Sequence, residues 1–482
     1  MSVGTLVIIG VLITQLAVIF GFILLERRQP AATLAWILGV LFVPVVGVVL
    51  YLVLGLRRTT KRSRAAEKIA KRTDEVFARH TLALRNADTG RSLAPWVEPT
   101  ISLGTRVDQS PASQGNAVSI LRNAAATYDA MIAAIEAAVD HVHVLFYIIQ
   151  PDETGKRLRE LLTRRAADGI EVRVLCDAIG SIRLPSDFWA PLEAAGGMAA
   201  YFAPVRIAPR FRRRDRINFR NHRKVVVVDG RIGLTGGINV GREYLGLDPD
   251  IGEWRDSHIR LAGPSVVGLQ QTFVEDWLTT TGELLDDARY FPLPHAEPPG
   301  DAVVQIVASG PDRPWSLIHR IYALAIAQAR ERVWISSPYF VPDRVIQSAI
   351  VTAALSGVDT RLLVPKRSDS RLVTWASRSY YGELLDAGVR IYEYDRGFLH
   401  TKSMVIDSWL GTIGSANMDI RSFHLNYELN AFVYDEPFTG ELAQQFVDDL
   451  RYAHELPPDW SHKLRYGQRL LHAFAGLMSP LL

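Results

Sequence analysis

Two long apolar stretches open the chain. Residues Val3–Leu25 form 23 consecutive positions without a charged side chain, and Ala31–Leu56 form another 26. Because about 20 apolar residues suffice to cross a bilayer core as a helix, the pattern predicts a transmembrane helical hairpin over residues 1–58. A secretory signal is disfavoured, since the first stretch lacks a basic start and a small-residue cleavage site. Pro44 lies inside the second stretch and predicts a kink or a re-entrant hairpin there.

The charges that flank these stretches predict their orientation. The connector 26–30 carries two arginines, whereas eight basic residues lie between Arg57 and Arg72. The more basic flank tends to be cytoplasmic, so we expect two transmembrane helices with the N-terminus and the large C-terminal body on the cytoplasmic side. Residues 59–115 are interpreted as a basic linker. Within it, segment 61–85 predicts a helix that either lies near anionic headgroups or is simply solvated.

Beyond the linker, short apolar strands alternate with amphipathic helices. A strand, a helix and a second strand follow one another in two places, at 142–149, 158–162 and 169–175, and again at 333–335, 345–355 and 357–363. Such alternation predicts an α/β fold. We expect two α/β/α halves, residues 116–295 and 296–460, packed as a pseudo-dimer, and a helical C-terminal tail over 461–482.

One polar pattern occurs once in each predicted half. Lysine follows histidine by two residues, aspartate by seven and asparagine by seventeen. The copies are His222, Lys224, Asp229 and Asn239, and His400, Lys402, Asp407 and Asn417. Chance does not readily produce four identities in the same spacing, and a pseudo-dimer would bring the two histidines together.

The residue types of this pattern suit chemistry on a phosphate. An apolar run follows each lysine, Val225–Val228 and Ser403–Ile406, and both runs predict strands. Side chains two positions apart on a strand point to the same side, so each histidine is expected to share a site with its lysine. An imidazole can serve as nucleophile or proton carrier near neutral pH, while the lysines and asparagines can bind phosphoryl oxygens.

Four acidic residues accompany the motif. Asp229 and Asp407 belong to the two copies but have the opposite parity from the histidines, so we expect them to hold the following turns. Asp256 and Glu428 each stand in a polar interruption before an apolar strand. They are the candidates for the carboxylates that orient the histidines by accepting from the second ring nitrogen.

The doubled pattern resembles the signature of the phospholipase D superfamily, His-x-Lys-x4-Asp with a downstream Gly-Ser-x-Asn. The second copy matches completely, whereas the first has Gly237 where serine is usual, which removes one hydroxyl donor. With the apolar N-terminus and the segments 220–224, 254–256 and 397–400, the chain resembles bacterial cardiolipin synthases over nearly its whole length, up to about Asp435.

This resemblance implies a function at the bacterial inner membrane. A phosphatidyl group would pass between two phosphatidylglycerol molecules to give cardiolipin and glycerol, in a ping-pong reaction without metal or cofactor. His222 would be the nucleophile that forms a phosphohistidine, and His400 the acid and base, although the spacing itself is symmetrical. The expected partners are phosphatidylglycerol, other anionic phospholipids and the membrane, and phosphatidylethanolamine is left open as the second lipid.

Composition sets further limits. The 54 Lys and Arg residues nearly balance the 51 Asp and Glu residues, so no nucleic-acid partner is expected. The single cysteine, Cys176, excludes an intramolecular disulfide and lies in an apolar run typical of a buried strand. His141 and His143 alternate at a strand start, but no third ligand has an interpretable spacing, so no metal site is predicted.

Two segments outside the motif carry basic charge. Nine basic residues and one acid lie between Arg206 and Lys224, which indicates either a loop held against anionic lipid or a solvated loop. The tail from Leu464 to Leu482 combines apolar residues with Arg465 and Arg469. It predicts a packed terminal helix, with a helix on the membrane surface as the alternative.

Two other functions compete with lipid synthesis. A hydrolase of the same superfamily would use water in place of the second alcohol, on phospholipids or, less favoured by the membrane stretches, on nucleic acid. Product analysis distinguishes these activities. An inactive membrane scaffold is the third possibility, but the intact histidines, lysines and asparagines of both copies argue against it.

Overall fold

The computed structural model describes residues 2–25, 30–51, 97–108, 110–203, 219–249, 252–292, 298–313 and 315–479. The chain forms two compact units, residues 1–61 and 62–480. Three sequence predictions fall outside the described residues: the hairpin connector at 26–29, the linker helix at 61–85 and the greater part of the basic loop, 206–218.

Helices build the N-terminal unit. Their bounds are Val3–Val18 for α1, Ile19–Ile23 for the π-helical turn η1, Pro30–Phe42 for α2 and Pro44–Leu50 for α3. Among the described residues, Gly4–Ile23 forms a helix long and apolar enough to cross a membrane. It coincides with the first predicted span. The second predicted span is divided between α2 and α3, and stays a prediction.

Pro44 divides the second apolar stretch. Proline has no N–H to bond to the carbonyl four residues earlier, which is that of Val40. Gln15 of α1 supplies the missing donor, because its Nε2 lies 2.6 Å from the Val40 oxygen. The chain also folds back, since an added Cβ at Gly47 would lie 2.2 Å from the oxygen of Gly39. The chain therefore bends sharply between α2 and α3, at the predicted position.

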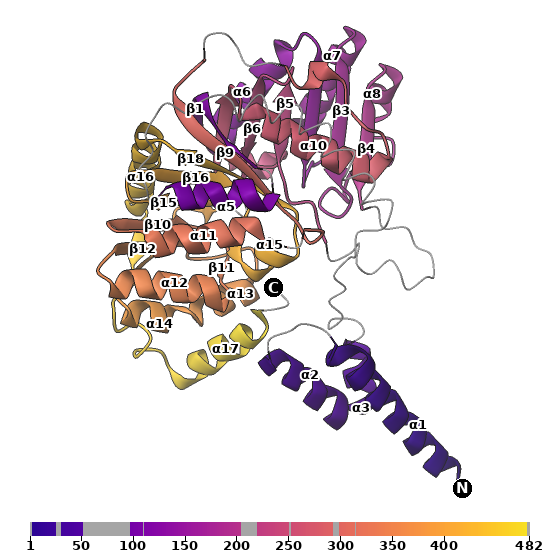
Figure 1. Ribbon diagram of the computed structural model, residues 1–482, viewed down its shortest axis with the longest axis vertical. Coiled ribbons are helices and arrows are strands. Elements are labelled where there is room, and N and C mark those ends of the chain that lie inside the picture. Colours follow the sequence, from indigo (N-terminus) through magenta and orange to yellow (C-terminus); the bar gives the residue numbers. More distant parts are fainter. Residues whose placement is uncertain are drawn as a thin grey trace. The chain divides into compact units, whose positions relative to one another are not determined.

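A mixed sheet of fifteen strands organises the second unit (Figure 1). Its centre is the antiparallel pair β1 (Ala112–Arg122) and β9 (Ala302–Ser309). Beyond β1 lie β8 (Ser257–Ala262), β6 (Ile232–Gly236), β5 (Val225–Val228), β2 (His141–Phe146), β3 (Glu171–Asp177) and β4 (Met198–Phe202). Beyond β9 lie β18 (Glu428–Tyr434), β16 (Leu410–Gly414), β15 (Ser403–Ile406), β10 (Arg332–Ser336), β12 (Asp359–Pro365), β13 (Arg390–Tyr394) and β19 (Ala453–Glu455).

Apart from the outermost strand β19, which is antiparallel to β13, the two sides of the central pair have the same order of strand directions. Reading outward, antiparallel strands come first, and each side then reaches a parallel trio, β2, β3 and β4 on one side and β10, β12 and β13 on the other. The strands that follow the two motif lysines, β5 and β15, hold equivalent third positions. The predicted α/β class is therefore confirmed, with the motif strands at the predicted residues.

One strand ends earlier than predicted. The sequence pattern extends β2 to Ile149, but the strand ends at Phe146. Beyond it, the Ile148 N–H donates to Asn239 Oδ1 at 3.1 Å, and Ile149 forms an isolated bridge with Val240. The sequence stays apolar because Ile149 is still buried, although the backbone no longer pairs with the neighbouring strands beyond Phe146.

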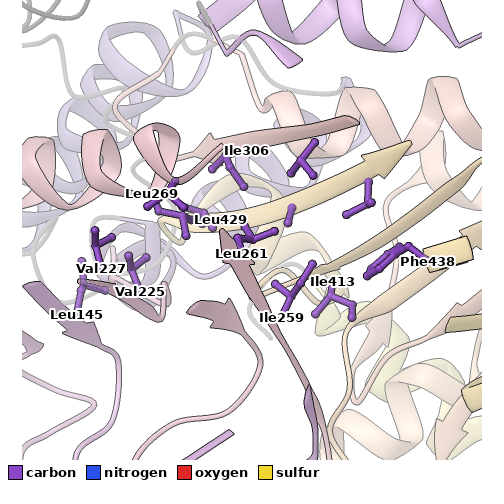
Figure 2. Close-up of a cluster of buried hydrophobic side chains, with 14 of the residues drawn as sticks. Leu145, Val225, Val227, Ile259, Leu261, Leu269, Ile306, Ile413, Leu429 and Phe438 are labelled. Atoms are coloured by element: carbon purple, nitrogen blue, oxygen red, sulfur yellow. The ribbon is translucent and has the colours of Figure 1, made fainter. Parts of the chain in front are cut away.

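Helices cover both faces of the sheet (Figure 1). The helices packed near the first motif strand are α6 (Asn123–Glu136), α7 (Glu153–Ala167) and α8 (Ala190–Ala194); those near the second are α11 (Leu317–Gln328), α12 (Arg344–Leu355) and α14 (Tyr381–Asp386), with α5 (Glu98–Asp108) on α11. The opposite face carries α10 (Val266–Thr281) and α16 (Glu436–Leu450), over one continuous apolar cluster (Figure 2).

The side chains of β5 alternate between the two hydrophobic clusters that cover the two faces of the sheet. Val225 and Val227 join the cluster under α10 and α16, whereas Val226 and Val228 join the cluster under α6 and α7. Successive strand side chains point to opposite faces, so a strand between two layers must be apolar at every position. Cys176 is buried in β3 for the same reason, as predicted.

Candidate active site

Each motif histidine is hydrogen-bonded through its backbone to a segment that leads into a strand on the other side of the central pair β1 and β9. The His222 N–H donates to the carbonyl of Tyr427 at 2.9 Å. The His400 N–H donates to the carbonyl of Arg255 at 2.7 Å, beside the parallel pair β7 (Trp254–Arg255) and β14 (Phe398–Leu399). Each histidine is thereby placed next to the residue that follows its backbone partner.

Those neighbours are the two candidate carboxylates, and the pairs are crossed. His400 Nδ1 lies 2.7 Å from Asp256 Oδ2, across 144 positions of sequence. His222 Nδ1 lies 3.1 and 3.0 Å from the two carboxylate oxygens of Glu428, across 206 positions. Both carboxylates are fully buried, while the histidine side chains keep 8 to 12% exposure. Each motif copy therefore meets the carboxylate of the other.

The two lysines are buried beside their histidines, as the strand spacing predicts. Lys224 Nζ donates to the His222 carbonyl at 2.6 Å. Lys402 Nζ donates to the His400 carbonyl at 2.5 Å and lies 2.9 and 3.1 Å from the two ring nitrogens of His400. Both histidines line one cleft, and each has a buried lysine and a buried carboxylate beside it.

Burial governs the protonation of these side chains. Burial, with Lys402 beside the ring, lowers the pKa of His400 to about 4, and burial also lowers the pKa of His222. Burial lowers the pKa of Lys224 to about 7 and that of Lys402 to about 8. Burial alone would raise the pKa of both carboxyl groups, but the adjacent lysines and histidines outweigh it and hold each below its usual value. Near pH 7 the imidazoles are neutral and the carboxylates ionised.

The two motif asparagines line the same cleft as the histidines. Asn239 accepts from the Ile148 N–H at 3.1 Å and donates from Nδ2 to the Tyr244 hydroxyl at 3.1 Å. Asn417 is 5% exposed, and its Oδ1 is buried without a hydrogen-bond partner among the residues that the structure describes. Both amides therefore belong to the wall of the cleft, and the two hydrogen bonds of Asn239 hold its amide in place.

The motif aspartates lie away from the cleft. Asp229 Oδ1 accepts from the N–H groups of Asp140 and His141 at 2.8 and 2.9 Å. Asp407 Oδ1 accepts from Glu331 and Arg332 at 2.8 and 3.0 Å. Both have positive φ, 54° and 49°, in the turn after the motif strand. Each carboxylate ties its turn to the start of the neighbouring strand, which is the role expected from the parity.

The turn residues that differ between the copies touch the two carboxylates. Ser415 Oγ donates to Glu428 Oε2 at 2.5 Å. At Gly237 an added Cβ would lie 2.2 Å from Asp256 Oδ1. The glycine of the first copy therefore leaves the space that Asp256 occupies, and a serine there would have to displace the carboxylate.

The cleft has a volume of about 420 Å³ and contains residues that the spacing did not reveal. They are Tyr147, Tyr244, Trp254, Tyr339, Asp369, Asp419 and Arg421, together with Arg220 beside the first motif. Burial raises the pKa of Asp419 to about 6. Tyr147, Tyr339 and Asp369 lie in loops after strand ends, where no repeated spacing marks them. Trp254 and Arg220 belong to the segments 254–256 and 220–224 that carry the family resemblance, and the sequence offered no signal for the others.

A buried polar network supports the first motif. Arg220 Nη1 lies 3.2 Å from Asp177 Oδ1. Arg223 donates from Nη1 to both oxygens of Asp276 at 2.8 Å, and Asn221 Nδ2 donates to Asp276 at 2.8 Å. The residues on both sides of His222 are therefore anchored, which limits the motion of its backbone.

One group within the described ranges has the donor types of a metal site. Ligand-type atoms of His319, Asp343 and His424 lie within 4.8 Å of one another. His319 Nε2 is 3.0 Å from Asp343, and His424 Nε2 is 3.5 Å from it, so hydrogen bonds and ion pairing account for the group. It is separate from the paired His141 and His143, which are buried in β2.

Comparison with known families matches both motif copies. A family model described as "Cardiolipin synthase, PLD-like domain" matches residues 131–277 and 322–450, more than half of the chain. A second model, described as "Phospholipase_D-nuclease N-terminal", matches residues 12–55.

Related proteins extend over nearly the whole chain. A cardiolipin synthase of Geobacillus thermodenitrificans is 41% identical over 98% of this chain and 94% of its own. A cardiolipin synthase 2 of Bacillus anthracis is 40% identical over 95% of this chain and 88% of its own. Among solved structures, a phosphatidylserine synthase of Haemophilus influenzae has a similar fold, with a TM-score of 0.60, 16% identity and coverage of 80% of this chain and 98% of that one.

The fold and the doubled motif define an α/β protein with phospholipase D-like domains. The chain belongs to the cardiolipin synthase family.

Proposed function

We propose that the protein is a membrane-bound phosphatidyltransferase that joins two phosphatidylglycerol molecules into cardiolipin and releases glycerol. The observation that carries this proposal is the pair of histidines that line one cleft, each hydrogen-bonded at Nδ1 to a buried carboxylate of the other motif copy. One histidine can bind the phosphatidyl group covalently while the other moves protons, as a transfer between two alcohols requires.

In the first step, His222 Nε2 attacks the phosphorus and the bond to the headgroup glycerol breaks. Glu428 keeps the proton on Nδ1 of His222 through both of its oxygens, at 3.1 and 3.0 Å, which leaves the Nε2 lone pair available. His400 donates the proton that the departing glycerol oxygen takes. The anionic phosphodiester raises the low pKa of His400 toward the range of a general acid.

In the second step, a hydroxyl group of another phosphatidylglycerol attacks the phosphohistidine. His400 accepts its proton, the phosphorus–nitrogen bond breaks, and His222 is restored. Lys224 and Lys402 supply positive charge for the phosphoryl oxygens, and Asn239 and Asn417 border the same space. A well-placed donor of this kind contributes roughly 3 kcal/mol to a transition state.

The finer architecture is also part of the proposal. Two phospholipase D-like halves, residues 116–295 and 296–460, pack as a pseudo-dimer, which the matching strand orders on both sides of β1 and β9 support. The apolar N-terminus anchors the protein, with two spans and a cytoplasmic body proposed from the flanking charges. Phosphatidylglycerol and other anionic phospholipids are the proposed partners.

The test is product analysis with the purified full chain in phosphatidylglycerol vesicles. We expect equal amounts of cardiolipin and glycerol, and loss of both with His222→Ala or His400→Ala. Full activity in either variant would refute the two-histidine mechanism. Phosphatidic acid in place of cardiolipin would identify a hydrolase instead.

A further inference from the structure

The C-terminal helix α17 (Tyr466–Leu477) presents its large apolar side chains to the outside. Tyr466, Leu470, Phe474 and Leu477 are between 53 and 79% exposed. Their spacing of four, four and three residues puts them on one stripe of the helix. His472 and Ala475, which are buried, occupy the opposite side. A terminal helix that served only to complete the hydrophobic core would bury its large apolar side chains.

The inner side of α17 packs on a helix at the edge of the cleft. Ala475 forms a buried cluster with Ala376 of α13 (Arg371–Arg378) and with Val341 of β11 (Phe340–Val341). Tyr380, just beyond α13, has its hydroxyl 3.1 Å from Ser479 Oγ. Figure 1 shows α17 alongside α13.

Helix α13 in turn forms part of the cleft wall. Its N-cap residue, Ser370, and its first-turn residue Val373 line the cleft together with His222 and His400. The exposed stripe of α17 is therefore one helix away from the cleft that contains the reacting groups.

The charged residues in the sequence around the stripe are all basic. From Ser461 to Leu482 the chain carries Lys463, Arg465 and Arg469 and no acidic residue. Arg465 and Arg469 are exposed at the start of α17. An apolar stripe with basic residues beside it matches a bilayer that has anionic headgroups above an apolar interior.

We propose that α17 is an interfacial helix that inserts its stripe of Tyr466, Leu470, Phe474 and Leu477 into an anionic bilayer and so holds the edge of the cleft at the lipid surface. The proposal rests on the proposed function, because a lipid whose acyl chains stay in the bilayer can reach His222 and His400 only if the cleft opens close to that surface. Membrane anchoring by the N-terminal unit alone tethers the body but does not orient it.

The first experiment measures insertion directly. The full chain carrying Cys176→Ala and Phe474→Cys is labelled with an environment-sensitive fluorophore and reconstituted into vesicles containing lipids with a quencher in the acyl chain. The matched control is Leu355→Cys, because Leu355 is 69% exposed and apolar but lies at the end of α12, before β12 and away from the cleft.

We expect strong quenching at position 474 in vesicles with phosphatidylglycerol, weaker quenching with zwitterionic lipid only, and little at position 355 in either. Equal, weak quenching at both positions would overturn the proposal. Energy transfer between labelled copies without lipid quenching would also overturn it, since a second copy of the chain would then cover the stripe.

The second experiment separates docking from chemistry. The double variant Phe474→Ser with Leu477→Ser is compared with Leu355→Ser on two substrates, long-chain phosphatidylglycerol in vesicles and a short-chain form dissolved as monomers. We expect kcat/KM on vesicles to fall roughly tenfold or more for the double variant, because two apolar side chains leave the bilayer, with unchanged activity on monomers.

Equal losses on both substrates would show that the stripe only stabilises the fold, and no loss on either would show that it does not dock. Absence of cardiolipin from the unmodified protein with both substrates would instead refute the proposed function, and the quenching result would still decide whether α17 inserts.

Discussion

Replacing Asp256 by asparagine removes a charge from the cleft while keeping its shape. Asp256 is fully buried, and its Oδ2 lies 2.7 Å from His400 Nδ1. A carboxylate accepts the Nδ1 proton and leaves Nε2 free to take a proton from a substrate hydroxyl. An amide can donate to Nδ1 and favour the opposite tautomer, in which Nε2 already carries a proton. The change should therefore disable His400 as a base.

Two general magnitudes bound the expected loss of kcat. A hydrogen bond to a charged group contributes about 1.5 to 3 kcal/mol, which corresponds to a factor of roughly 10 to 150 in rate. The equivalent change in a serine protease triad, which also forces the wrong tautomer, lowers kcat about 10⁴-fold. We therefore expect kcat of Asp256→Asn to fall by roughly 10² to 10⁴.

The assay uses a phosphatidyl ester of p-nitrophenol beside phosphatidylglycerol. p-Nitrophenolate departs without a proton, so the first step no longer needs a general acid. Asp256→Asn and His400→Ala should release one equivalent of p-nitrophenolate in a burst and then stall, because the phosphohistidine at His222 forms but no base activates the second alcohol. His222→Ala should give no burst.

The matched control is Glu428→Gln, which alters the other crossed pair. It should suppress the burst itself, since Glu428 orients the proposed nucleophile. A burst that survives in Glu428→Gln and is lost in Asp256→Asn would assign the covalent bond to His400 instead. Wild-type turnover of phosphatidylglycerol by Asp256→Asn, with unchanged thermal unfolding, would refute the role of the carboxylate.

Three further predictions concern charge, space and the membrane anchor. As the pH rises through 7 to 8, kcat/KM should fall, because the pKa values of about 7 for Lys224 and about 8 for Lys402 mean that these buried groups lose their positive charge in that range; a pH–rate profile that stays flat there would contradict their cationic role. Gly237→Ser should lower kcat at least roughly tenfold, because its Cβ would meet Asp256 Oδ1 at 2.2 Å and shift a triad-like carboxylate; wild-type kinetics would show that the carboxylate has room to move. Gln15→Leu should destabilise the N-terminal unit by about 0.6 kcal/mol, the average for hydrogen bonds between membrane helices, and by no more than about 1.7 kcal/mol, their maximum; unfolding in detergent measures this, with unchanged activity on monomeric substrate as the control.

Local spacing predicted the parts of the site that depend on one strand. His222 with Lys224, and His400 with Lys402, come together because a strand repeats every two residues, and the strands after them begin and end where the apolar runs do. Asp229, one residue beyond β5 and of opposite parity, holds a turn for the same reason.

The crossed pairing could not be predicted from local pattern. Asp256 was recognisable as a candidate because it stands in a polar interruption before an apolar strand. Which histidine it meets depends on the pairing of β7 with β14, two short strands far apart in sequence. Likewise, Tyr339 and Asp369 enter the cleft from loops whose course is decided by the strands before them. Long-range topology determines these contacts, and no repeat in the sequence encodes it.

The departure at Gly237 follows from the same topology. In the second copy, Ser415 donates to Glu428, whose longer side chain reaches His222 with both oxygens. In the first copy, the shorter Asp256 lies against the turn itself, and glycine is the residue that leaves it room. The turn residue and the carboxylate are thus matched around each copy of the motif, while the histidine that the carboxylate contacts belongs to the other copy. A change of the turn residue alone in one copy would disturb the histidine of the other, so the two copies can differ without either having decayed.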